Sequence, residues 1–354
     1  MSDRLPIFDG HNDVLLRLLN KKNDSAHEHF LSGDGEGHID LPRAQKGGFA
    51  GGMFAVYISS RDDIGDIEEM MKGSSYDVPL PRIISSSEAL PTAMAMIAIL
   101  FRIERASQSR VKVCRTAREI RDCLKHGVLA TVLHIEGAEA IDEKLDSLEV
   151  FYQAGLRSIG PVWSRPTIFG HGVPFRYPAG PDTGPGLTDA GKALVRACNE
   201  LGIAIDLSHL NEKGFWDVAR ISKAPLIATH SNVHAISQHT RNLTDRQLAA
   251  IRESGGMVGL NFATCFLRAD GQVDPNTPLD QMLRHIDYLI QHLGIEGVGF
   301  GSDFDGAVVP AEIGDVAGLD SLRNALRRRG FTDDVMRKLC HENWIRVLER
   351  SWGE

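Results

Sequence analysis

Short apolar runs alternate along the chain with longer segments in which apolar residues recur at the helical spacing. Strands that alternate with helices predict a parallel sheet. Runs rich in Val, Ile, Phe and Gly predict eight strands, at residues 5–13, 48–59, 128–137, 157–163, 203–209, 225–230, 256–263 and 297–305. Eight such strands predict an α/β fold in which the sheet closes into a (β/α)8 TIM barrel rather than staying open.

The segments between the strands carry the helical signal. Residues 188–201 illustrate it, because Thr188 is a suitable N-cap and Gly202 follows the last apolar position. Helices are predicted at 87–107, 142–154, 188–201, 211–222, 244–254, 279–293 and 332–349. No linker, low-complexity tract or long internal repeat interrupts the pattern, so we expect residues 1–354 to form a single domain.

Two stretches do not fit this alternation and are predicted to be long loops. Residues 21–42 are polar and contain His27, His29 and His38, and residues 164–185 are rich in proline and glycine. Long irregular loops on a barrel usually shape an active site or an interface. The three histidines are interpreted as ordinary loop residues, with a place in the cleft as the alternative.

Composition narrows the class of partner. With 42% hydrophobic residues the chain can bury a large core, and a net charge of −8 argues against a phosphate backbone as a partner, so no nucleic acid is expected. The apolar run 93–100 is too short for a membrane span, and residues 1–6 do not resemble an export signal. The scattered cysteines predict reduced thiols in a cytoplasmic protein without a membrane partner; they are Cys114, Cys123, Cys198, Cys265 and Cys340.

The strand ends carry the candidate chemistry. His11 and Asp13 are two residues apart at the end of the first strand, so their side chains project from one face and can meet at a divalent cation. An isolated His-x-Asp is weak evidence, but other strands end in the same way. The further strand-end residues are Glu136, His209, His230 and Asp303. In a barrel all of these ends lie at the C-terminal face, where active sites are built.

Three histidines and three carboxylates at one barrel mouth suffice for two divalent ions with one carboxylate shared between them. Two neighbouring metal ions can bridge a hydroxide and polarise a carbonyl. If Asp303 lies outside the ligand set, it is placed to relay a proton to a leaving amine.

A single histidine at a strand end is more often a hydrogen-bonded structural residue than a ligand. We interpret His134 in that way, and Asp9, Asp206 and Asp305 as groups that satisfy backbone donors or cap a turn. Six strand-end residues on one rim are poorly explained by the same structural reading.

The chain resembles the membrane (renal) dipeptidase family of zinc peptidases, a branch of the amidohydrolase-type barrels. The matching segments run in order from end to end and are specific as a set: D-G-H-N-D (9–13), G-G-F-A-G-G-M-F (47–54), H-I-E-G (134–137), G-L-R-S-I (155–159), I-D-L-S-H (205–209), A-T-H-S (228–231), R-N-L (241–243) and G-F-G-S-D-F-D-G (299–306). The resemblance implies two zinc ions per chain, one held by His11 and Asp13 and the other by His209 and His230, with Glu136 bridging them.

The resemblance also implies that Asp303 handles the proton and that Arg241 binds the C-terminal carboxylate of the substrate. A planar guanidinium is a good bidentate partner for a carboxylate. Without the resemblance, Arg241 would be interpreted as an ordinary surface arginine.

One position departs from the family pattern. Typical members end strand four in Thr-His, and that histidine contacts the scissile group, whereas this chain has Val162-Trp163. An indole offers a large apolar face and one donor. We therefore expect Trp163 to form a pocket wall and a donor to come from the following loop, with His171 first and Arg165 or Arg176 next. A surface role for all three is the alternative.

Together these features predict a cytoplasmic, homodimeric, binuclear zinc hydrolase. It would cleave the amide of a dipeptide with a free carboxylate by means of a metal-bridging hydroxide. The alternatives are a zinc amidohydrolase for N-acyl amino acids, including N-acyl-D-amino acids, and a metal-binding scaffold without activity.

Overall fold

A computed structural model of the chain describes residues 4–21, 25–59 and 65–353. It confirms the predicted α/β barrel: eight parallel strands form a nearly closed sheet in the order β8-β6-β5-β2-β1-β11-β10-β9. The strands of this sheet are β1 (Ile7–Asn12), β2 (Phe49–Tyr57), β5 (Leu129–Glu136), β6 (Leu156–Gly160), β8 (Ala204–Ile205), β9 (Ile227–Ala228), β10 (Met257–Asn261) and β11 (Val298–Gly301).

The two ends of this path meet. Asp206, just after β8, forms a parallel bridge with Ile227 of β9, and the Leu207 amide donates to the Ile227 carbonyl at 2.9 Å. Both strands are shorter than the apolar runs that predicted them. The Asp206 carboxylate accepts from the amides of Ser208 and Thr229 at 3.0 and 2.8 Å, which replaces the regular ladder there.

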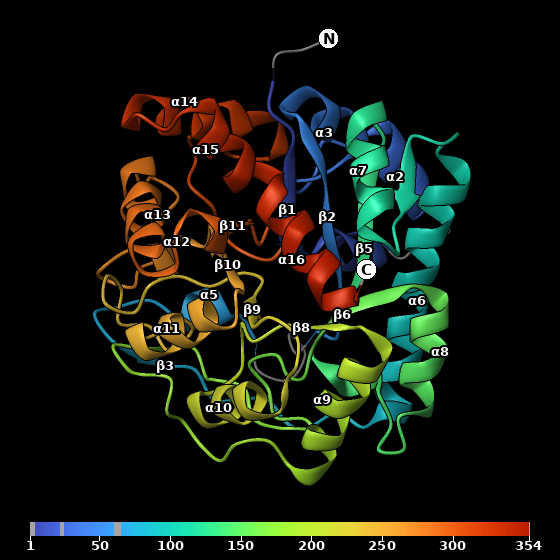
Figure 1. Cartoon of the computed structure of the whole chain (residues 1–354), viewed down its shortest axis with the longest axis vertical. Helices are drawn as coiled ribbons and strands as arrows, with labels where there is room; N and C mark the ends of the chain where they lie inside the picture. The colour runs from blue at the N-terminus through green and yellow to red at the C-terminus, as the bar shows by residue number, and fades with distance from the viewer. Residues whose placement is uncertain (1–3, 22–24, 60–64, 354) are drawn as a thin grey trace.

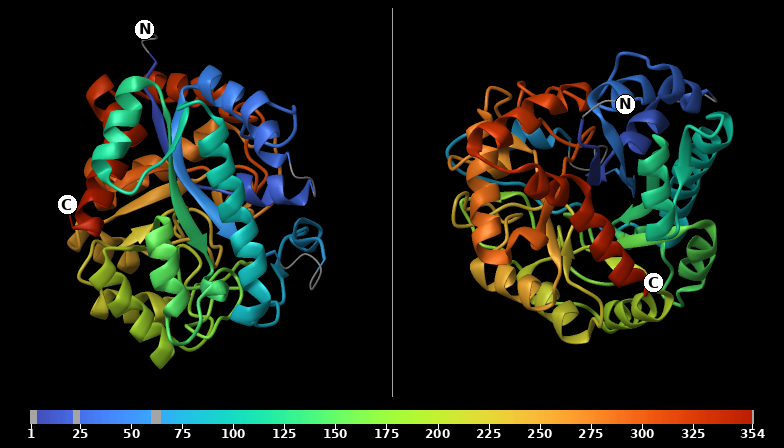
Figure 2. Two further views of the ribbon diagram at one scale, coloured as in Figure 1. Left: turned by 90° about the vertical axis from the view of Figure 1, so that its right-hand side faces the viewer. Right: turned by 45° about the horizontal axis from the view of Figure 1, so that its top comes forward.

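Helices surround the strands in the views of Figures 1 and 2. Those that match the predicted segments are α6 (Ser86–Ala106), α8 (Asp146–Ala154), α9 (Asp189–Leu201), α10 (Glu212–Ile221), α11 (Asp245–Glu253), α13 (Leu279–Leu293), α15 (Asp333–Arg337) and α16 (Asn343–Trp352). The predicted cap of α9 is confirmed, because the Thr188 hydroxyl accepts from the Gly191 amide at 3.0 Å and Gly202 has a φ of 70°.

Several short elements were not predicted: α1 (Val14–Asn20), α2 (Ala26–Ser32), α3 (Leu41–Gly47), α5 (Ile67–Met70), α7 (Ala117–His126), α12 (Thr264–Leu267), α14 (Leu319–Arg329), β3 (Tyr76–Asp77), β4 (Val111–Val113) and β7 (Arg176–Tyr177). The loop prediction for residues 21–42 is therefore wrong in part, since α2 lies inside it. This helix buries only Ala26 and Phe30, too few positions to produce a visible period. Residues 22–24 lie outside the described residues.

Helix α6 matches the predicted segment 87–107 to within one residue at each end and extends on both sides of the apolar run 93–100. It continues through Phe101-Arg102 to Ala106, and an 18-residue window has a mean hydropathy of 1.3. By length and composition alone this helix could cross a membrane, so the expectation that no apolar stretch has that length is wrong. Core helices pass the same test, and 39% of the window is buried inside this fold.

The interior of the barrel is closed at its N-terminal end by a side chain from α16. Trp344 is fully buried and donates to the Phe300 carbonyl at 2.8 Å. Its ring lies so close to Gly10 of β1 that a Cβ there would stand 2.4 Å from a ring carbon. In Figure 1, α16 lies across the strands. The C-terminal end of the barrel is therefore the end available to a ligand.

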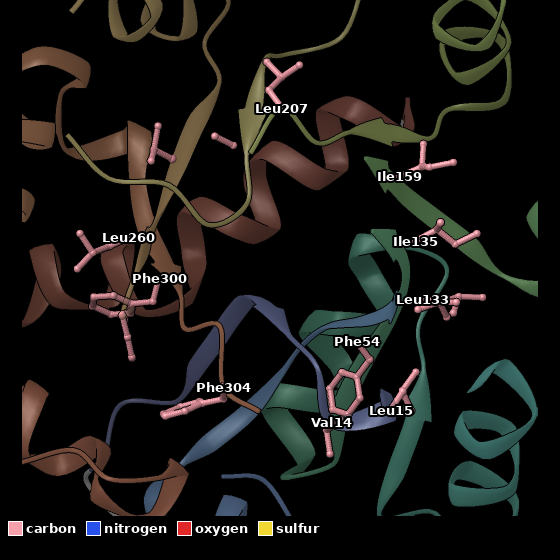
Figure 3. Close-up of a cluster of buried hydrophobic side chains, with 14 of the residues drawn as sticks. Val14, Leu15, Phe54, Leu133, Ile135, Ile159, Leu207, Leu260, Phe300 and Phe304 are labelled. Carbon is pink, nitrogen blue, oxygen red and sulfur yellow. The ribbon is translucent and has the colours of Figure 1, made fainter. Parts of the chain in front are cut away.

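A second apolar layer joins the outer faces of the strands to the helices. Figure 3 shows part of it, including Phe54 of β2, Leu133 of β5, Ile159 of β6 and Leu260 of β10. Since side chains alternate along a strand, their neighbours in sequence point into the barrel. On β5 the inward positions include His134 and Glu136. Because the apolar residues between them pack outward, these two polar side chains point into the barrel.

Candidate metal centre and active site

The first part of the site is formed where β1 meets α1. His11 is fully buried, and its Nε2 lies 3.3 Å from Oδ2 of Asp13. The Asp13 amide donates to the Phe304 carbonyl at 2.8 Å, which fixes the chain at this corner. Asp13 precedes α1 but makes no capping hydrogen bond, and its Oδ1 has no partner among the described residues. A buried carboxylate oxygen without a partner indicates a ligand.

Glu136, the last residue of β5, connects the two halves of the site. Its Oε2 lies 3.6 Å from Nε2 of His11, while its Oε1 lies 2.9 Å from Nε2 of His209 and 3.3 Å from Nε2 of His230. The two oxygens of one carboxylate thus face different histidines. This is the arrangement that the sequence predicted for a shared ligand.

The spacing of these atoms fits tetrahedral metal coordination. Nε2 of His209 and Nε2 of His230 are 3.1 Å apart, so with Oε1 of Glu136 they form a triangle with sides of 2.9 to 3.3 Å. A tetrahedral zinc site with bonds of 2.0–2.1 Å has ligand–ligand edges of about 3.3 Å. The donor set of imidazole and carboxylate is also one that zinc accepts. This group therefore fits a divalent cation, and His11, Asp13 and Glu136 form a second group of potential ligands among the described residues.

The protonation preferences in the cluster agree with this assignment. Burial, together with nearby positive groups, holds the pKa of His209 and His230 well below the usual range, so both rings are neutral with a free lone pair. Their other nitrogens are held by hydroxyls, with Ser164 at 2.9 Å from His209 Nδ1 and Thr229 at 2.8 Å from His230 Nδ1. Such partners orient ligating histidines.

The opposite half of the cluster carries excess negative charge. Burial alone would lower the pKa of His11, but Glu136 and Asp13 beside it raise this pKa to about 10. Burial raises the pKa of Glu136 well above its usual value and also raises that of Asp303. These carboxylates therefore need positive charge nearby, which divalent cations supply.

Asp303 follows β11 in a conformation that few non-glycine residues adopt, with a φ of 58°. Its Oδ2 accepts from Asn261 Nδ2 at 2.9 Å, and it groups with His11 and His230 as a potential ligand set. Gly306 allows this approach, because a Cβ there would lie 2.2 Å from Asp13 Oδ2 and 2.6 Å from Asp303 Oδ1. Asp303 is thus held beside the metal cluster with one oxygen already oriented.

Arg241 lies in the loop that follows β9 and is only 2% exposed. Its guanidinium donates to the carbonyls of Ser208 and His230 and stands 5.4 Å above the Phe266 ring. Its Nε has no partner, and no carboxylate among the described residues lies within ion-pair distance of it. Burial lowers the pKa of Arg241 to about 10, so its charge is retained at neutral pH. The interpretation as a surface arginine is wrong.

A cavity of about 500 Å³ opens beside these groups. Asp13, Glu136, His209 and Asp303 form part of its wall. The other lining residues include an aromatic group (Tyr57, Trp163, Phe175 and Phe266), an acidic group that we call the acidic rim (Asp66, Glu68 and Asp305), and Arg17 and His38. The candidate metal ligands thus face a space of the size typical of a small-molecule site.

Comparison with known proteins identifies the group to which this arrangement corresponds. Residues 1–351 match the model of the family described as membrane dipeptidase, peptidase family M19. The chain belongs to the M19 dipeptidase family. A metallo peptidase from Rhodobacter sphaeroides, solved with a phosphinate mimic of the dipeptide L-Ala-D-Ala, is 57% identical over 99% of this chain and 100% of its own, with a TM-score of 0.97.

Two further relatives agree with the family assignment. A crystal structure described as dipeptidase AC, a metallo peptidase of family M19, is 57% identical, covers 99% of both chains and has a TM-score of 0.96. An uncharacterised protein of Klebsiella pneumoniae, from the region 5′ of pqqA, is 52% identical over 73% of this chain and 95% of its own length. This member of the M19 family is therefore a metal-dependent peptidase.

In this M19 dipeptidase the polar residues that we interpreted as structural have structural partners. Asp9 accepts from the amide and hydroxyl of Ser302 at 2.6 and 2.8 Å, and Asp305 accepts from the His38 amide at 2.6 Å. His134 Nδ1 pairs with the Ser158 hydroxyl at 2.9 Å. Burial lowers the pKa of His134 to about 4, so its ring is neutral below the metal cluster.

The structure brings Trp163 to the cavity but not the proposed donors of the following loop. The Trp163 ring lies 5.8 Å from the His209 ring and forms part of the cavity wall. Arg165 is buried against Glu139 at 3.1 Å, Arg176 pairs with Asp77 at 2.8 Å, and half-buried His171 is not among the residues that line the cavity. Trp163 thus forms part of the cavity wall, as predicted, whereas the donor role of His171 stays a prediction.

Sequence reasoning missed most of the aromatic group that lines the cavity. Tyr57 is the last residue of β2, so the strand-end rule applied to the second strand would have found it. Phe175 lies in a loop and Phe266 in the short helix α12, and both reach the barrel mouth only through long-range packing, with their rings 6.1 Å apart. No local pattern marks these two residues. His38 was interpreted as an ordinary loop histidine with a place in the cleft as the alternative; it lines the cavity, and its Nδ1 accepts from the Asp305 amide at 2.8 Å.

Proposed function

We propose that this M19 protein is a binuclear zinc dipeptidase that hydrolyses dipeptides with a free C-terminal carboxylate. The observation that carries the proposal is the position of Glu136, whose two oxygens face His11 on one side and His209 and His230 on the other. When bound there, two zinc ions would supply an activated water and polarise the scissile carbonyl.

Asp303 supplies the proton transfer in this proposal. It lies next to the ligand cluster, and its carboxylate is oriented by Asn261. Burial raises its pKa, which moves a carboxylate closer to the range in which it both takes and gives a proton. Asp303 would take the proton from the attacking water and deliver it to the departing amine.

Arg241 would bind the substrate carboxylate, although it is buried and is not among the residues that line the cavity. A buried charge is normally paired, yet the described carboxylates leave Arg241 without an ion pair while its Nε is unsatisfied. An anionic substrate group would complete this environment. The absence of an ion-pair partner for Arg241 among the described residues therefore supports a requirement for a free C-terminal carboxylate.

The acidic rim favours a dipeptide over an N-acyl amino acid. Asp66, Glu68 and Asp305 line the cavity together with one arginine, Arg17. Arg17 is itself close to carboxylates, with Nη1 at 3.3 Å from Asp34 and Nε at 3.3 Å from Asp305. The negative charge of this rim attracts the ammonium group of a dipeptide, whereas it provides no electrostatic attraction for a neutral acyl group.

The second candidate, a zinc amidohydrolase for N-acyl amino acids, is supported by the aromatic group that lines the cavity. Trp163 and Phe175 pack with their rings 5.5 Å apart and present an apolar surface that suits an acyl chain. The inactive scaffold is the weakest reading, because the candidate ligands and Asp303 lie together in the fold.

Stereochemistry can be proposed from the relative. The Rhodobacter sphaeroides protein was solved with a mimic of L-Ala-D-Ala, and this supports a D-residue on the carboxyl side of the bond cleaved here. A suitable assay reconstitutes the purified protein with zinc and measures metal content and turnover of L-Ala-D-Ala, L-Ala-L-Ala and N-acetyl-D-Ala. Turnover of N-acetyl-D-Ala alone would replace the dipeptidase proposal by the second candidate, and fewer than two ions per chain would exclude the binuclear centre.

A further inference from the structure

The attacked carbonyl oxygen gains negative charge as the amide is cleaved, and a protein donor placed against this oxygen accelerates the reaction. We infer that the donor in this protein is the hydroxyl of Tyr57, and that Arg165 is a positioning residue that acts through Tyr57. The inference rests on the proposed function, because it concerns the same reaction at the same cavity.

The strand register places Tyr57 beside the shared ligand. Tyr57 ends β2, and its Cα partner on the neighbouring parallel strand β5 is Glu136. Paired residues of adjacent strands project from the same face of a sheet. Met53, four residues earlier on β2, packs into the barrel interior with Trp344, so the alternation also directs Tyr57 inward. The phenol therefore projects from the rim of the barrel next to the Glu136 carboxylate.

The Tyr57 hydroxyl is available to a ligand. Tyr57 is half-buried and lines the cavity with Glu136 and His209, and among the described residues its hydroxyl has no hydrogen-bond partner. Buried tyrosine hydroxyls usually find one. A phenol has an ordinary pKa of about 10, so it keeps its proton and can donate a hydrogen bond at neutral pH.

The ring of Tyr57 is fixed by Trp163 and, behind it, by Arg165. The Tyr57 and Trp163 rings lie 5.0 Å apart at 52°. Arg165 is fully buried, with its guanidinium 5.6 Å from the Trp163 ring. Its Nη2 donates to the Ile58 carbonyl at 2.6 Å, and its Nη1 pairs with Glu139 at 3.1 Å. Since Ile58 follows Tyr57 directly, this arginine holds the backbone at the end of β2.

Trp163 presents the competing donor on this wall. Its indole N–H has no hydrogen-bond partner among the described residues, and its ring lies 5.8 Å from the ring of the candidate ligand His209. We favour Tyr57 because it is paired with Glu136 in the strand register and because a phenol is a stronger hydrogen-bond donor than an indole. The two are separable by substitution.

The test compares Tyr57→Phe with the wild-type enzyme loaded with zinc. Loss of one donor to the developing oxyanion should lower kcat about a hundredfold with little change in KM. Affinity for a phosphinate dipeptide mimic, measured by calorimetry, should fall by a similar factor, because the phosphinate oxygens imitate the tetrahedral state. Metal content should stay unchanged, which separates the donor role from damage to the ligand cluster.

Tyr76→Phe is the matched control. Tyr76 belongs to the same aromatic cluster, but its hydroxyl donates to the Gly271 carbonyl at 2.6 Å and it does not line the cavity. This variant should keep the wild-type kcat and phosphinate affinity. Trp163→Phe, which removes the competing donor but keeps an aromatic wall, should lower the phosphinate affinity far less than Tyr57→Phe does.

Arg165→Met tests the positioning role. It should lower kcat in the wild-type background but add nothing to Tyr57→Phe, since it acts through the phenol. Because removal of a buried charge can prevent folding, Arg165→Lys is measured beside it and should recover part of the kcat. Equal additive losses in both backgrounds would show that Arg165 serves the fold alone.

A Tyr57→Phe enzyme with wild-type kcat and phosphinate affinity would overturn the inference. A hundredfold loss of kcat in Trp163→Phe but not in Tyr57→Phe would identify the indole of Trp163 as the donor instead. Failure of the proposed function is distinguishable. It would appear as a wild-type protein that turns over no dipeptide, whereas the Tyr57 comparison is a ratio on whichever amide the wild type cleaves. If none is cleaved, the phosphinate affinities decide: equal values for Tyr57→Phe and wild type refute the donor.

Discussion

Replacement of Arg241 by alanine separates a substrate-binding arginine from a structural one. The guanidinium is buried, lacks an ion pair within the described part of the chain, and lies next to the backbone of the candidate ligands His209 and His230. If it binds the substrate carboxylate, truncation leaves that anion unpaired in a buried site. Such truncations cost about 2 to 5 kcal/mol, which corresponds to a loss in kcat/KM of about 30- to 5000-fold.

The effect on stability is of similar size in free energy but corresponds to a small shift in melting temperature. Arg241→Ala leaves the carbonyls of Ser208 and His230 without this donor, at about 1 to 3 kcal/mol for each unsatisfied group, while removal of a buried charge offsets part of the loss. A net change of about 2 to 4 kcal/mol in a chain of 354 residues, with an unfolding entropy of about 0.7 kcal/mol/K, lowers Tm by about 3 to 5 °C. The variant should therefore be folded at assay temperature.

The assay measures kcat/KM for L-Ala-D-Ala and for its C-terminal amide, with wild-type, Arg241→Ala and Arg241→Lys enzymes of known metal content. The preference for the free acid should collapse in the alanine variant and be partly retained by lysine, which keeps the charge but not the fork geometry. Equal losses on acid and amide would refute the reasoning and assign Arg241 to the support of the ligand backbone.

Four further substitutions test the rest of the site. Glu136→Gln should lower the zinc content from two ions per chain, because it removes the charge shared by both ligand groups; elemental analysis that still finds two would exclude Glu136 as the bridge. Asp303→Asn should keep the metal and lose about two to four orders of magnitude in kcat, and a variant with wild-type kcat would remove Asp303 from the reaction. Trp163→His should shift preference toward simple L,L-dipeptides while His171→Ala stays silent, as its place outside the cavity lining implies; a loss of kcat on His171→Ala would restore the loop donor.

The barrel and the ligand cluster were predictable because both depend on local patterns. Each apolar run that ends in a histidine or carboxylate marks a strand and its C-terminal end at once. Topology then brings His11, Glu136, His209 and His230 to one rim without any knowledge of loop conformation. The family resemblance was confirmed by the match over residues 1–351.

The walls of the cavity were not predictable in the same way. Phe175 and Phe266 lie on segments whose direction is set by tertiary packing. Arg165 is buried in an ion pair with Glu139, which follows β5, and the sequence around Arg165 does not indicate this partner. Short helices such as α2 bury too few positions to leave a period in the sequence. The homodimer, the cytoplasmic location and the absence of a membrane partner stay predictions.

The order of strands explains why one carboxylate joins both halves of the centre. β5, which ends in Glu136, is separated from β8 by β6 alone and from β1 by β2 alone. Glu136 therefore stands midway between His209 and His11 on the rim. The two intervening strands lead into Trp163 and Tyr57, so ligand strands and wall strands alternate along this side of the barrel. A substitution at a wall position can therefore change the hydrogen-bond donor or the shape of the pocket while the ligand positions stay fixed. In this way Trp163 can depart from the family pattern while the candidate metal ligands match it.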